Sequence, residues 1–456
     1  MTEYKPVIGL EIHVELKTKS KMFCQCSADY FGKKPNTNTC PVCLGLPGAL
    51  PVPNRLAVEW SVLIGLALNC SINHNTKFDR KNYFYPDLPK GYQISQYDEP
   101  FAIKGSLKVR SPKSEVVKEF RVHRVHLEED TGKLLHEGKE TKIDFNRSGV
   151  PLVEIVTEPD FDNADDVKAF LEELHTIIEY LGVSDADMEK GSMRMEPNIS
   201  LRIVESRKSK VESNNEYLDP KDLPKYKVEV KNINSFNFVK KAVEYELKRQ
   251  QEILEKGELP AQETRGYDEK TETTYSQRSK EEAHDYRYFP EPDIPPMKFE
   301  NDYILRLKSK LPELPAARVA RYVQADGLKQ VDAIVLTKNK SLGDYYELVK
   351  TEAQATDLKK QAIANLIINK KIPISLSAKE FVKKAAEKSQ PITTDLNILS
   401  KTILSVIEKN PKAAADYRNG KENALMFLLG QIMREMKGKA DANVVREELK
   451  KAFKNE

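Results

Sequence analysis

The alternation of apolar and polar positions near the start of the chain predicts a half-buried β-strand. From Ile8 to Leu16 every even position is apolar, whereas Glu11, His13 and Glu15 occupy odd positions. A period of two is typical of a strand with one face in the core, and it places the carboxylates and the imidazole together on the other face. Alternate side chains on a strand can hold a divalent cation, and oxygen-rich ligation favours Mg²⁺ or Mn²⁺ over zinc. The solvated outer face of an edge strand explains the same pattern.

Periodicity along the next 250 residues predicts mixed α and β structure. Residues 1–160 alternate short strand-like runs with turns rich in Pro, Gly and Asn. Helices are expected near 55–68, at 165–181 with Gly182 as the C-terminal cap, and at about 236–256, and further strands near 199–204 and 226–231.

A cluster of prolines from Phe289 to Pro296 predicts a domain boundary, because such a run continues neither a helix nor a central strand. Beyond it the patterns are helical, which gives three expected domains at 1–296, 297–400 and 401–456. Residues 401–456 contain 12 Lys and Arg against 8 Asp and Glu. Basic helices of this kind can follow RNA phosphates, although lysine-rich solvated helices are common without RNA.

The composition of the 456-residue chain indicates a globular protein, with 39% hydrophobic and 31% charged residues. No apolar run approaches the roughly 18 residues needed to cross a membrane, and the start of the chain shows no targeting segment, so a cytoplasmic protein is expected. The net charge of +3 means that any nucleic-acid contact must come from local basic patches.

Four of the five cysteines have the spacing of a zinc site. Cys24 and Cys26 are separated from Cys40 and Cys43 by a short loop, so residues 24–43 resemble a zinc knuckle. A closed site of four cysteines has no open coordination position, which favours structural over catalytic zinc. Reduced thiols without metal are the alternative. Cys70 lies in an apolar run and is expected in the core.

Three further strand-like segments carry candidate chemistry. Each sets acids beside amides or bases: Arg124, His126 and Glu128 with Glu129 and Asp130; Arg194, Glu196 and Asn198; Glu229 and Lys231. Carboxylates can hold a cation while Lys and Arg neutralise phosphate, although ordinary solvated strand faces have similar sequences. Neither a P-loop nor a dinucleotide-binding glycine motif is present, so any ATP would bind through metal and sheet.

Aromatic and basic side chains are interleaved over residues 81–96, and they are candidates for contacts with a nucleotide. Aromatic rings can stack on a base, and amides can hydrogen-bond to it, although a packed loop gives the same pattern. The expected cofactor-binding residues are Lys81, Asn82, Tyr83, Tyr92, Gln93 and Ser95.

Long motifs spread over the whole chain resemble the B subunit of the aspartyl/glutamyl-tRNA amidotransferase, the GatB family. They lie at Gly9–Leu16, Phe78–Asp87, Tyr92–Gln96, Asp144–Gly149, Val153–Val156, Lys231–Phe236, Asp285–Pro292, Asn419–Lys421 and Gly430–Met433. The resemblance implies an α+β fold: an antiparallel-sheet cradle similar to the catalytic part of glutamine synthetase, an all-α helical domain, and a small helical tail domain that contacts tRNA.

The resemblance also implies a ligase that works as a heterotrimer. The family uses ATP and Mg²⁺ to phosphorylate the side-chain carboxylate of Glu or Asp on misacylated tRNA. An amidase (glutaminase) subunit releases ammonia, which travels through a channel and displaces the phosphate. A small third subunit joins the two larger ones.

On this resemblance, Glu11, His13 and Glu128 or Glu129 are expected to bind catalytic Mg²⁺. Glu196 would complete the set, while Lys231 and Arg147 face phosphate. Family members often carry Arg-Cys-Asp where this chain has Arg194-Met-Glu196, so the carboxylate of Glu196 is one methylene longer.

Glu15 has no evident partner, and it is expected to be the solvated end of its strand.

An alternative function of a different class is a non-catalytic tRNA-binding scaffold. Such a protein would have the zinc knuckle and the tail, but its acidic strands would have no chemical role. The archaeal relative of this family carries an inserted synthetase-like domain, for which the chain is too short.

Overall fold

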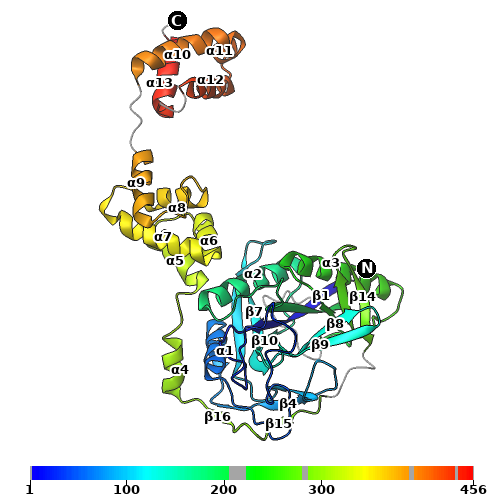
Figure 1. Ribbon diagram of the computed structural model, residues 1–456. Coiled ribbons are helices and arrows are strands. Elements are labelled where there is room, and N and C mark those ends of the chain that lie inside the picture. Colours follow the sequence, from blue (N-terminus) through cyan, green and yellow to red (C-terminus); the bar gives the residue numbers. More distant parts are fainter. Residues whose placement is uncertain (1–2, 205–221, 280–285, 390–394, 437–439, 455–456) are drawn as a thin grey trace. The chain divides into compact units, whose positions relative to one another are not determined.

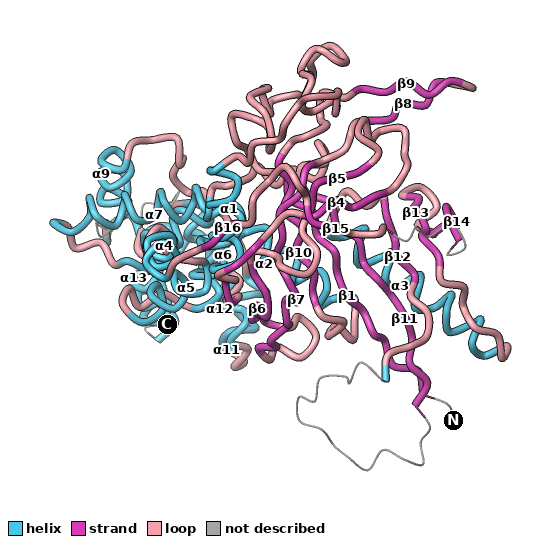
Figure 2. The backbone as a smooth tube through the Cα atoms, turned by 90° about the horizontal axis from the view of Figure 1, so that it is seen from below, coloured by secondary structure: helices cyan, strands magenta, loops and turns pink. Residues whose placement is uncertain are grey.

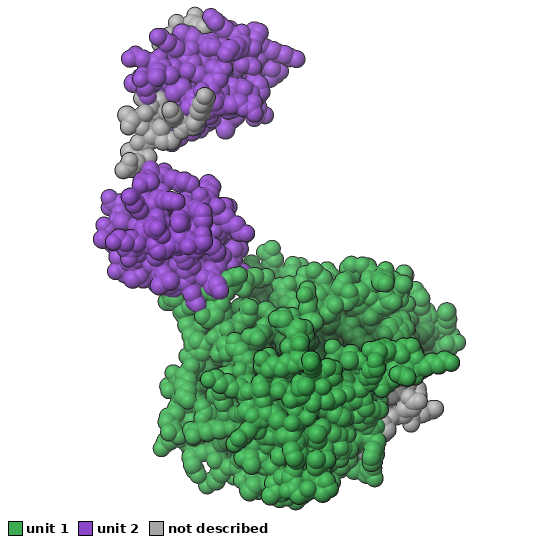
Figure 3. Space-filling model, in the orientation of Figure 1, with its two compact units in different colours: residues 1–321, 337–340 green, residues 322–336, 341–456 purple. Residues whose placement is uncertain are grey.

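The structure is a computed structural model that describes residues 3–204, 222–279, 286–389, 395–436 and 440–454. Asp285, the first residue of one family motif, lies outside these ranges. The chain forms two compact units, coloured separately in Figure 3: residues 1–321 with 337–340, and residues 322–336 with 341–456. The expected boundary after residue 296 stays a prediction.

A nine-stranded sheet forms the centre of the first unit (Figures 1 and 2). In spatial order its strands are β14 (Thr273–Ser279), β13 (Glu263–Asp268), β12 (Val228–Lys231), β11 (Met193–Val204), β1 (Glu3–Glu15), β10 (Pro151–Thr157), β7 (Val117–Glu129), β6 (Ala102–Arg110) and β2 (Ser71–Ile72). An antiparallel sheet was expected, and the sheet is mixed, because β12 and β13 pair in parallel while the other strand pairs are antiparallel. The architecture is consistent with the α+β class.

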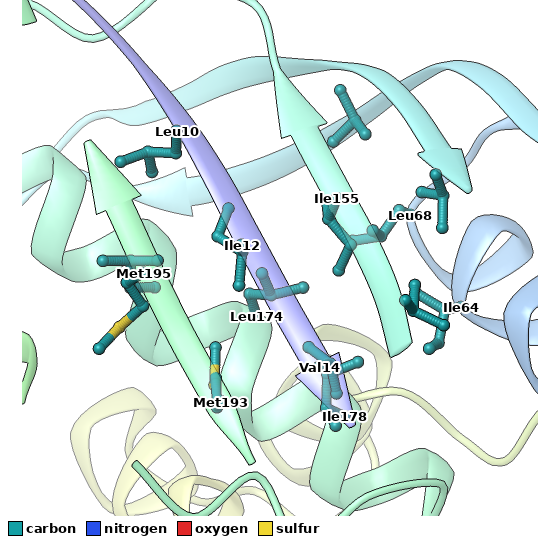
Figure 4. Packing of buried hydrophobic residues seen from close by; sticks show 14 of the residues in the cluster. Leu10, Ile12, Val14, Ile64, Leu68, Ile155, Leu174, Ile178, Met193 and Met195 are labelled. Carbon is teal, nitrogen blue, oxygen red and sulfur yellow. The ribbon is translucent and has the colours of Figure 1, made fainter. Parts of the chain in front are cut away.

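Three helices supply the packing for the apolar face of this sheet: α1 (Arg55–Ala67), α2 (Ala164–Leu181) and α3 (Phe236–Glu255). Figure 4 shows Leu10, Ile12 and Val14 of β1 beside side chains of α1, α2, β10 and β11. The helices begin where the sequence predicted, because Asn54, Asn163 and Ser235 accept hydrogen bonds from the first-turn amides. Gly182 ends α2 with a φ of 66°, as expected of a C-terminal cap.

Smaller sheets accompany the large one in the first unit (Figure 1). They are β15 (Phe289–Pro290) with β4 (Asp79–Asn82) and β5 (Tyr92–Ser95), β16 (Met297–Lys298) with β3 (Asn75–Thr76), and the hairpin of β8 (Lys133–Glu137) and β9 (Glu140–Asp144). The first of these matters for the site, since β5 hydrogen-bonds through its side chains to the end of β7.

The rest of the described chain is helical, as the periodicity predicted. Its helices are α4 (Asn301–Lys308), α5 (Pro315–Gln324), α6 (Gln330–Lys338), α7 (Lys340–Glu352), α8 (Lys360–Ile368), α9 (Ala378–Ser389), α10 (Leu396–Lys409), α11 (Pro411–Arg418), α12 (Glu422–Glu435) and α13 (Ala442–Lys454). Helices α10 to α13 share a core of their own, to which α12 contributes Leu425, Leu428 and Ile432. In the described chain, no helix is both long and apolar enough to cross a membrane.

Candidate active site

The strand register gathers the polar side chains of β1 and its neighbours on one face of the sheet. Glu11 lies opposite Glu196 of β11, and His13 lies opposite Glu154 of β10. Glu154 in turn lies opposite His126 of β7. Directly opposed residues in antiparallel strands point to the same side, so segments distant in sequence meet over one surface.

The first acidic group consists of His13, Glu128 and Glu154, whose ligand atoms lie within 4.8 Å of one another. His13 Nε2 is 4.0 Å from Glu128 Oε1 and 3.5 Å from Glu154 Oε2, and His126 Nε2 is 3.2 Å from the same Glu154 oxygen. Burial alone would lower the pKa of His13, but the hydrogen bond and charge of Glu154 raise it to about 9. Without metal, the group therefore holds a proton on His13 at neutral pH.

The second acidic group consists of Glu11, Glu196 and Glu229, again within 4.8 Å. Lys231 Nζ lies 2.9 Å from Glu196 and 3.4 Å from Glu229. Burial raises the pKa of Glu196, but Lys231 and His13 together bring it below its usual value. The pKa of Glu11 is raised by burial and by the charges of Glu154 and Glu229. Negative charge at Glu11 is thus incompletely balanced by protein cations.

The donor set of the two groups fits Mg²⁺ or Mn²⁺. Five carboxylates and one imidazole supply mainly oxygen ligands, which these cations prefer. A cation would also relieve the repulsion that raises the pKa of Glu11. His13 directs its Nε2 atom toward the carboxylates of Glu128 and Glu154. Its Nδ1 atom is buried and has no hydrogen-bond partner.

Both groups contribute to a pocket of about 330 Å³, lined by Glu11, Glu154 and Glu229 on the sheet. Lys81 also lines it, and its Nζ lies 5.0 Å from the centre of the Tyr286 ring. Burial lowers the pKa of Lys81, but Glu128 and Glu154 raise it above its usual value, so the amine stays charged. Cations beside carboxylates in a pocket can bind a metal-bound phosphate.

A second pocket of about 330 Å³ shares Glu11, Val156, Asn198, Lys227 and Gln262 with the first. Its remaining lining is largely apolar and includes Val7, Leu10, Pro159 and Leu223. A polar pocket continuous with an apolar one suits a ligand that has a charged end and a flat apolar end.

The structure does not bring Glu129 or Arg147 to either acidic group. Glu129 accepts hydrogen bonds from Lys90 and from the Ile94 amide at 2.8 and 2.9 Å. Arg147 donates to the carbonyl oxygens of Thr131 and Gly132 at 3.0 and 2.8 Å. The carboxylate and the guanidinium are therefore engaged in holding the loop after β7.

The structure describes all six residues that were expected to contact a nucleotide. Of these six, Lys81 alone lines the acid-lined pocket. Gln93 donates to the Glu129 carbonyl and Ser95 to the Glu128 carboxylate. Asn82 donates to the Arg287 carbonyl at 2.9 Å. The ring of Tyr92 lies under the Arg80 guanidinium, and Tyr83 packs edge-on against Tyr286. These contacts fix β4 and β5 over the end of β7.

The expectation that Glu15 is solvated was wrong, because its side chain is buried. Tyr30 donates a hydrogen bond to its carboxylate at 3.1 Å. Burial and the neighbouring Asp130 raise the pKa of Glu15 to about 8, whereas Arg147 and Arg194 hold Asp130 charged against the effect of its burial. The loop around Tyr30 covers this end of β1, and the side chain of Glu15 is therefore buried.

Sequence reasoning missed Glu154, which bridges the two histidines, and the pocket residues Tyr286 and Tyr288. A signal for Glu154 exists in the run Leu152-Val-Glu-Ile-Val156, where one acid interrupts a buried strand. A charge within such a run is costly unless it is paired.

The four knuckle cysteines converge as predicted, with all four sulfurs within 4.8 Å of one another. Cys40 and Cys43 sulfurs are 3.8 Å apart, which matches the roughly 3.8 Å edge of a tetrahedron with Zn–S bonds of about 2.3 Å. The Cys40 amide donates to the Cys43 sulfur at 3.1 Å, and Lys21 Nζ lies 3.8 Å from it. The cluster is thus compatible with structural zinc, and Cys70 is buried separately in the core.

A mixed sheet with an acid-lined face and a zinc-type cysteine cluster agrees with the comparison to protein families. Residues 6–305 match the GatB/GatE catalytic domain, and residues 317–453 match the GatB domain. The chain therefore belongs to the GatB family of tRNA amidotransferase subunits, a component of a ligase-type enzyme, and the resemblance seen in the sequence is confirmed.

The relatives to which the chain is similar include B subunits of one tRNA amidotransferase from different bacteria. The B subunit of the aspartyl/glutamyl-tRNA(Asn/Gln) amidotransferase from Carboxydothermus hydrogenoformans is 43% identical over 499 residues, with 99% of each chain covered. The protein of the same name from Thermotoga maritima is 42% identical over 497 residues, which cover 99% of this chain and 100% of the relative.

Proposed function

We propose that the first unit of this chain phosphorylates the side-chain carboxylate of Glu-tRNA(Gln), Asp-tRNA(Asn) or both, using ATP and Mg²⁺. Ammonia then displaces the phosphate to give the amide, Gln-tRNA(Gln) or Asn-tRNA(Asn). The observation that carries the proposal is the convergence of two acidic groups with Lys81 and Lys231 at one face of the sheet.

Phosphoryl transfer needs little covalent chemistry from a protein. It needs the two reactants held in line and the charge on the phosphoryl oxygens neutralised. Mg²⁺ held by His13, Glu128 and Glu154, and a second cation held by Glu11, Glu196 and Glu229, would supply part of that charge. Lys81 is positioned to supply the rest from the protein, since it stays charged at the wall of the pocket.

The two connected pockets support a placement for ATP that differs from the one expected from sequence. The phosphates would occupy the acid-lined pocket, and the base would occupy the apolar pocket beside Val7, Leu10 and Pro159. Residues 82–95 then act indirectly, because Ser95 holds Glu128 in place through its hydrogen bond of 2.9 Å.

A free carboxylate is a poor acyl donor, and its phosphorylation creates a leaving group that ammonia can displace. The ammonia would come from glutamine hydrolysis in a partner amidase (glutaminase), with a small third component completing a heterotrimer. The four-cysteine knuckle would hold structural zinc, since a closed tetrahedral site offers no position for substrate.

The test is reconstitution with the glutaminase and the small third component, followed by assay on each misacylated tRNA. Amidation should require ATP and Mg²⁺, and ammonium chloride should replace glutamine. Glu11→Ala should abolish amidation while tRNA binding is largely kept. If Glu11→Ala amidates at the full rate, the acidic face is inert, as a non-catalytic tRNA-binding scaffold would require.

A further inference from the structure

A third hollow lies on the polar face of β6 and β7, directly beside the acid-lined pocket. Its volume is about 510 Å³, and Tyr97, Lys104 and His123 are among its lining residues. Arg124 lines both this hollow and the acid-lined pocket. The two spaces therefore share a wall, and a ligand could extend from one into the other.

An irregularity in the strand pairing builds this hollow. Along β7, the partner of Val156 is Arg124, but the partner of the next residue of β10 is Val122, so His123 is an extra residue. His123 and Arg124 thus lie consecutively between the core residues Val122 and Val125. On β6, Lys104 has a φ of 54° at the same level. Bulges redirect side chains in this way, and they are frequent next to active sites.

An aromatic wall runs from this hollow into the acid-lined pocket. The ring of Tyr97 stacks on Tyr288 with centres 4.3 Å apart and planes 10° from parallel, and Tyr288 lies 6.1 Å from Tyr286. Tyr286 and Tyr288 line the acid-lined pocket, whereas Tyr97 lines the third hollow. Tyr97 is 50% exposed, which leaves ring surface open for a further stacking partner.

Positive charge in the hollow is only partly used by the protein. Arg121 pairs with Asp160 at 2.6 Å, and His123 pairs with Glu158 at 2.8 Å. Within the described parts of the chain, Lys104 and Arg124 make no ion pair, and the Nε of Arg124 is buried without a hydrogen-bond partner. An anionic ligand would satisfy both side chains.

We propose that this hollow binds the 3′-terminal nucleotide of the tRNA, with its base stacked on Tyr97 and its phosphate near Lys104 and Arg124. The proposal rests on the function proposed above. The reacting carboxylate is joined to the terminal ribose through about six bonds of roughly 1.5 Å, so the nucleoside must lie within about 9 Å of it. Unpaired RNA ends are bound by stacking on aromatic rings and by contacts with Arg and Lys. The third hollow offers both, across one wall from the acidic groups.

The test compares Tyr97→Ala with Tyr97→Phe in the reconstituted heterotrimer. Loss of one base stack should raise the KM for misacylated tRNA about 5- to 100-fold in Tyr97→Ala. Tyr97→Phe keeps the ring and should stay close to wild type, and the KM for ATP should change less than about twofold in both. An unchanged KM for tRNA in Tyr97→Ala would overturn the proposal, as would a rise confined to the KM for ATP.

A binding measurement separates this proposal from the proposed function. The trinucleotide CCA, the 3′ end of every tRNA, should bind the wild-type heterotrimer more tightly than the dinucleotide CC, and Tyr97→Ala should abolish the difference. Arg124→Gln should weaken binding of CCA and lessen its dependence on salt. Equal binding of CCA and CC to wild type would refute the proposed subsite even if amidation is observed. Absence of amidation in wild type would refute the proposed function, whatever CCA does.

Discussion

Replacing Glu154 with Gln should remove both the proposed chemistry and a measurable pH dependence of stability. In the absence of metal, Glu154 is the main reason why the pKa of His13 stands at about 9 instead of 6.5. This difference corresponds to about 3 kcal/mol in favour of the charged imidazole in the folded chain. Because the folded-state pKa is raised, this stabilisation is complete below about pH 6.5 and is lost as the pH rises through about 9. Gln keeps the size of Glu154 and one acceptor oxygen but carries no charge.

The fluorescence of Trp60 allows the measurement, because Trp60 is the single tryptophan of the chain and packs against the core of the first unit. Urea unfolding of chelator-treated protein would be followed at pH values from 6 to 9.5. The difference in unfolding free energy between wild type and Glu154→Gln should shrink by about 3 kcal/mol across this range. Glu179→Gln, which alters the more exposed pair with His175, is the matched control and should show no such change. Parallel curves for wild type and Glu154→Gln would refute the effect of Glu154 on the pKa of His13.

In the heterotrimer with Mg²⁺, Glu154→Gln should also lower the rate of amidation at least about 100-fold.

Three further changes test other parts of the structure. Lys231→Met should lower kcat for amidation about 100-fold, measured in the heterotrimer, because it leaves two carboxylates without their cation; a normal kcat would remove Lys231 from the site. Cys43→Ser should abolish zinc binding, as measured by metal analysis of the purified chain. Cys70→Ala should retain one zinc. Equal zinc contents in the two variants would refute zinc binding by the four-cysteine cluster. Gly105→Ala should destabilise the first unit by about 2–4 kcal/mol in urea unfolding, because a Cβ there would lie 2.3 Å from the Cys70 sulfur; Gly430→Ala, with open space around it, should be neutral or slightly stabilising.

Local patterns predicted the elements of the fold well. The alternation in β1 and the glycine cap at the end of α2 act over a few residues, and the structure agrees with both. The strand predicted at 199–204 proved to be the second half of β11, which begins at Met193. Its first half alternates Arg194, Glu196 and Asn198 with buried residues, a pattern that also predicts a strand.

The amino-acid sequence by itself determined the family, through motifs spread over the whole chain. It also determined the main helices and strands, the cysteine spacing and the polar face of β1, because each of these depends on residues close together in the chain. The tertiary structure decided which carboxylates meet. Strand register placed Glu154 between His13 and His126, whereas loop packing brought Lys90 to Glu129 and covered Glu15 with the loop around Tyr30. The pairing of β10 with β1 joins strands more than a hundred residues apart, and a shift of one residue in this register would turn Glu154 to the other face of the sheet. The division of the acidic residues into two groups is therefore a property of the folded sheet.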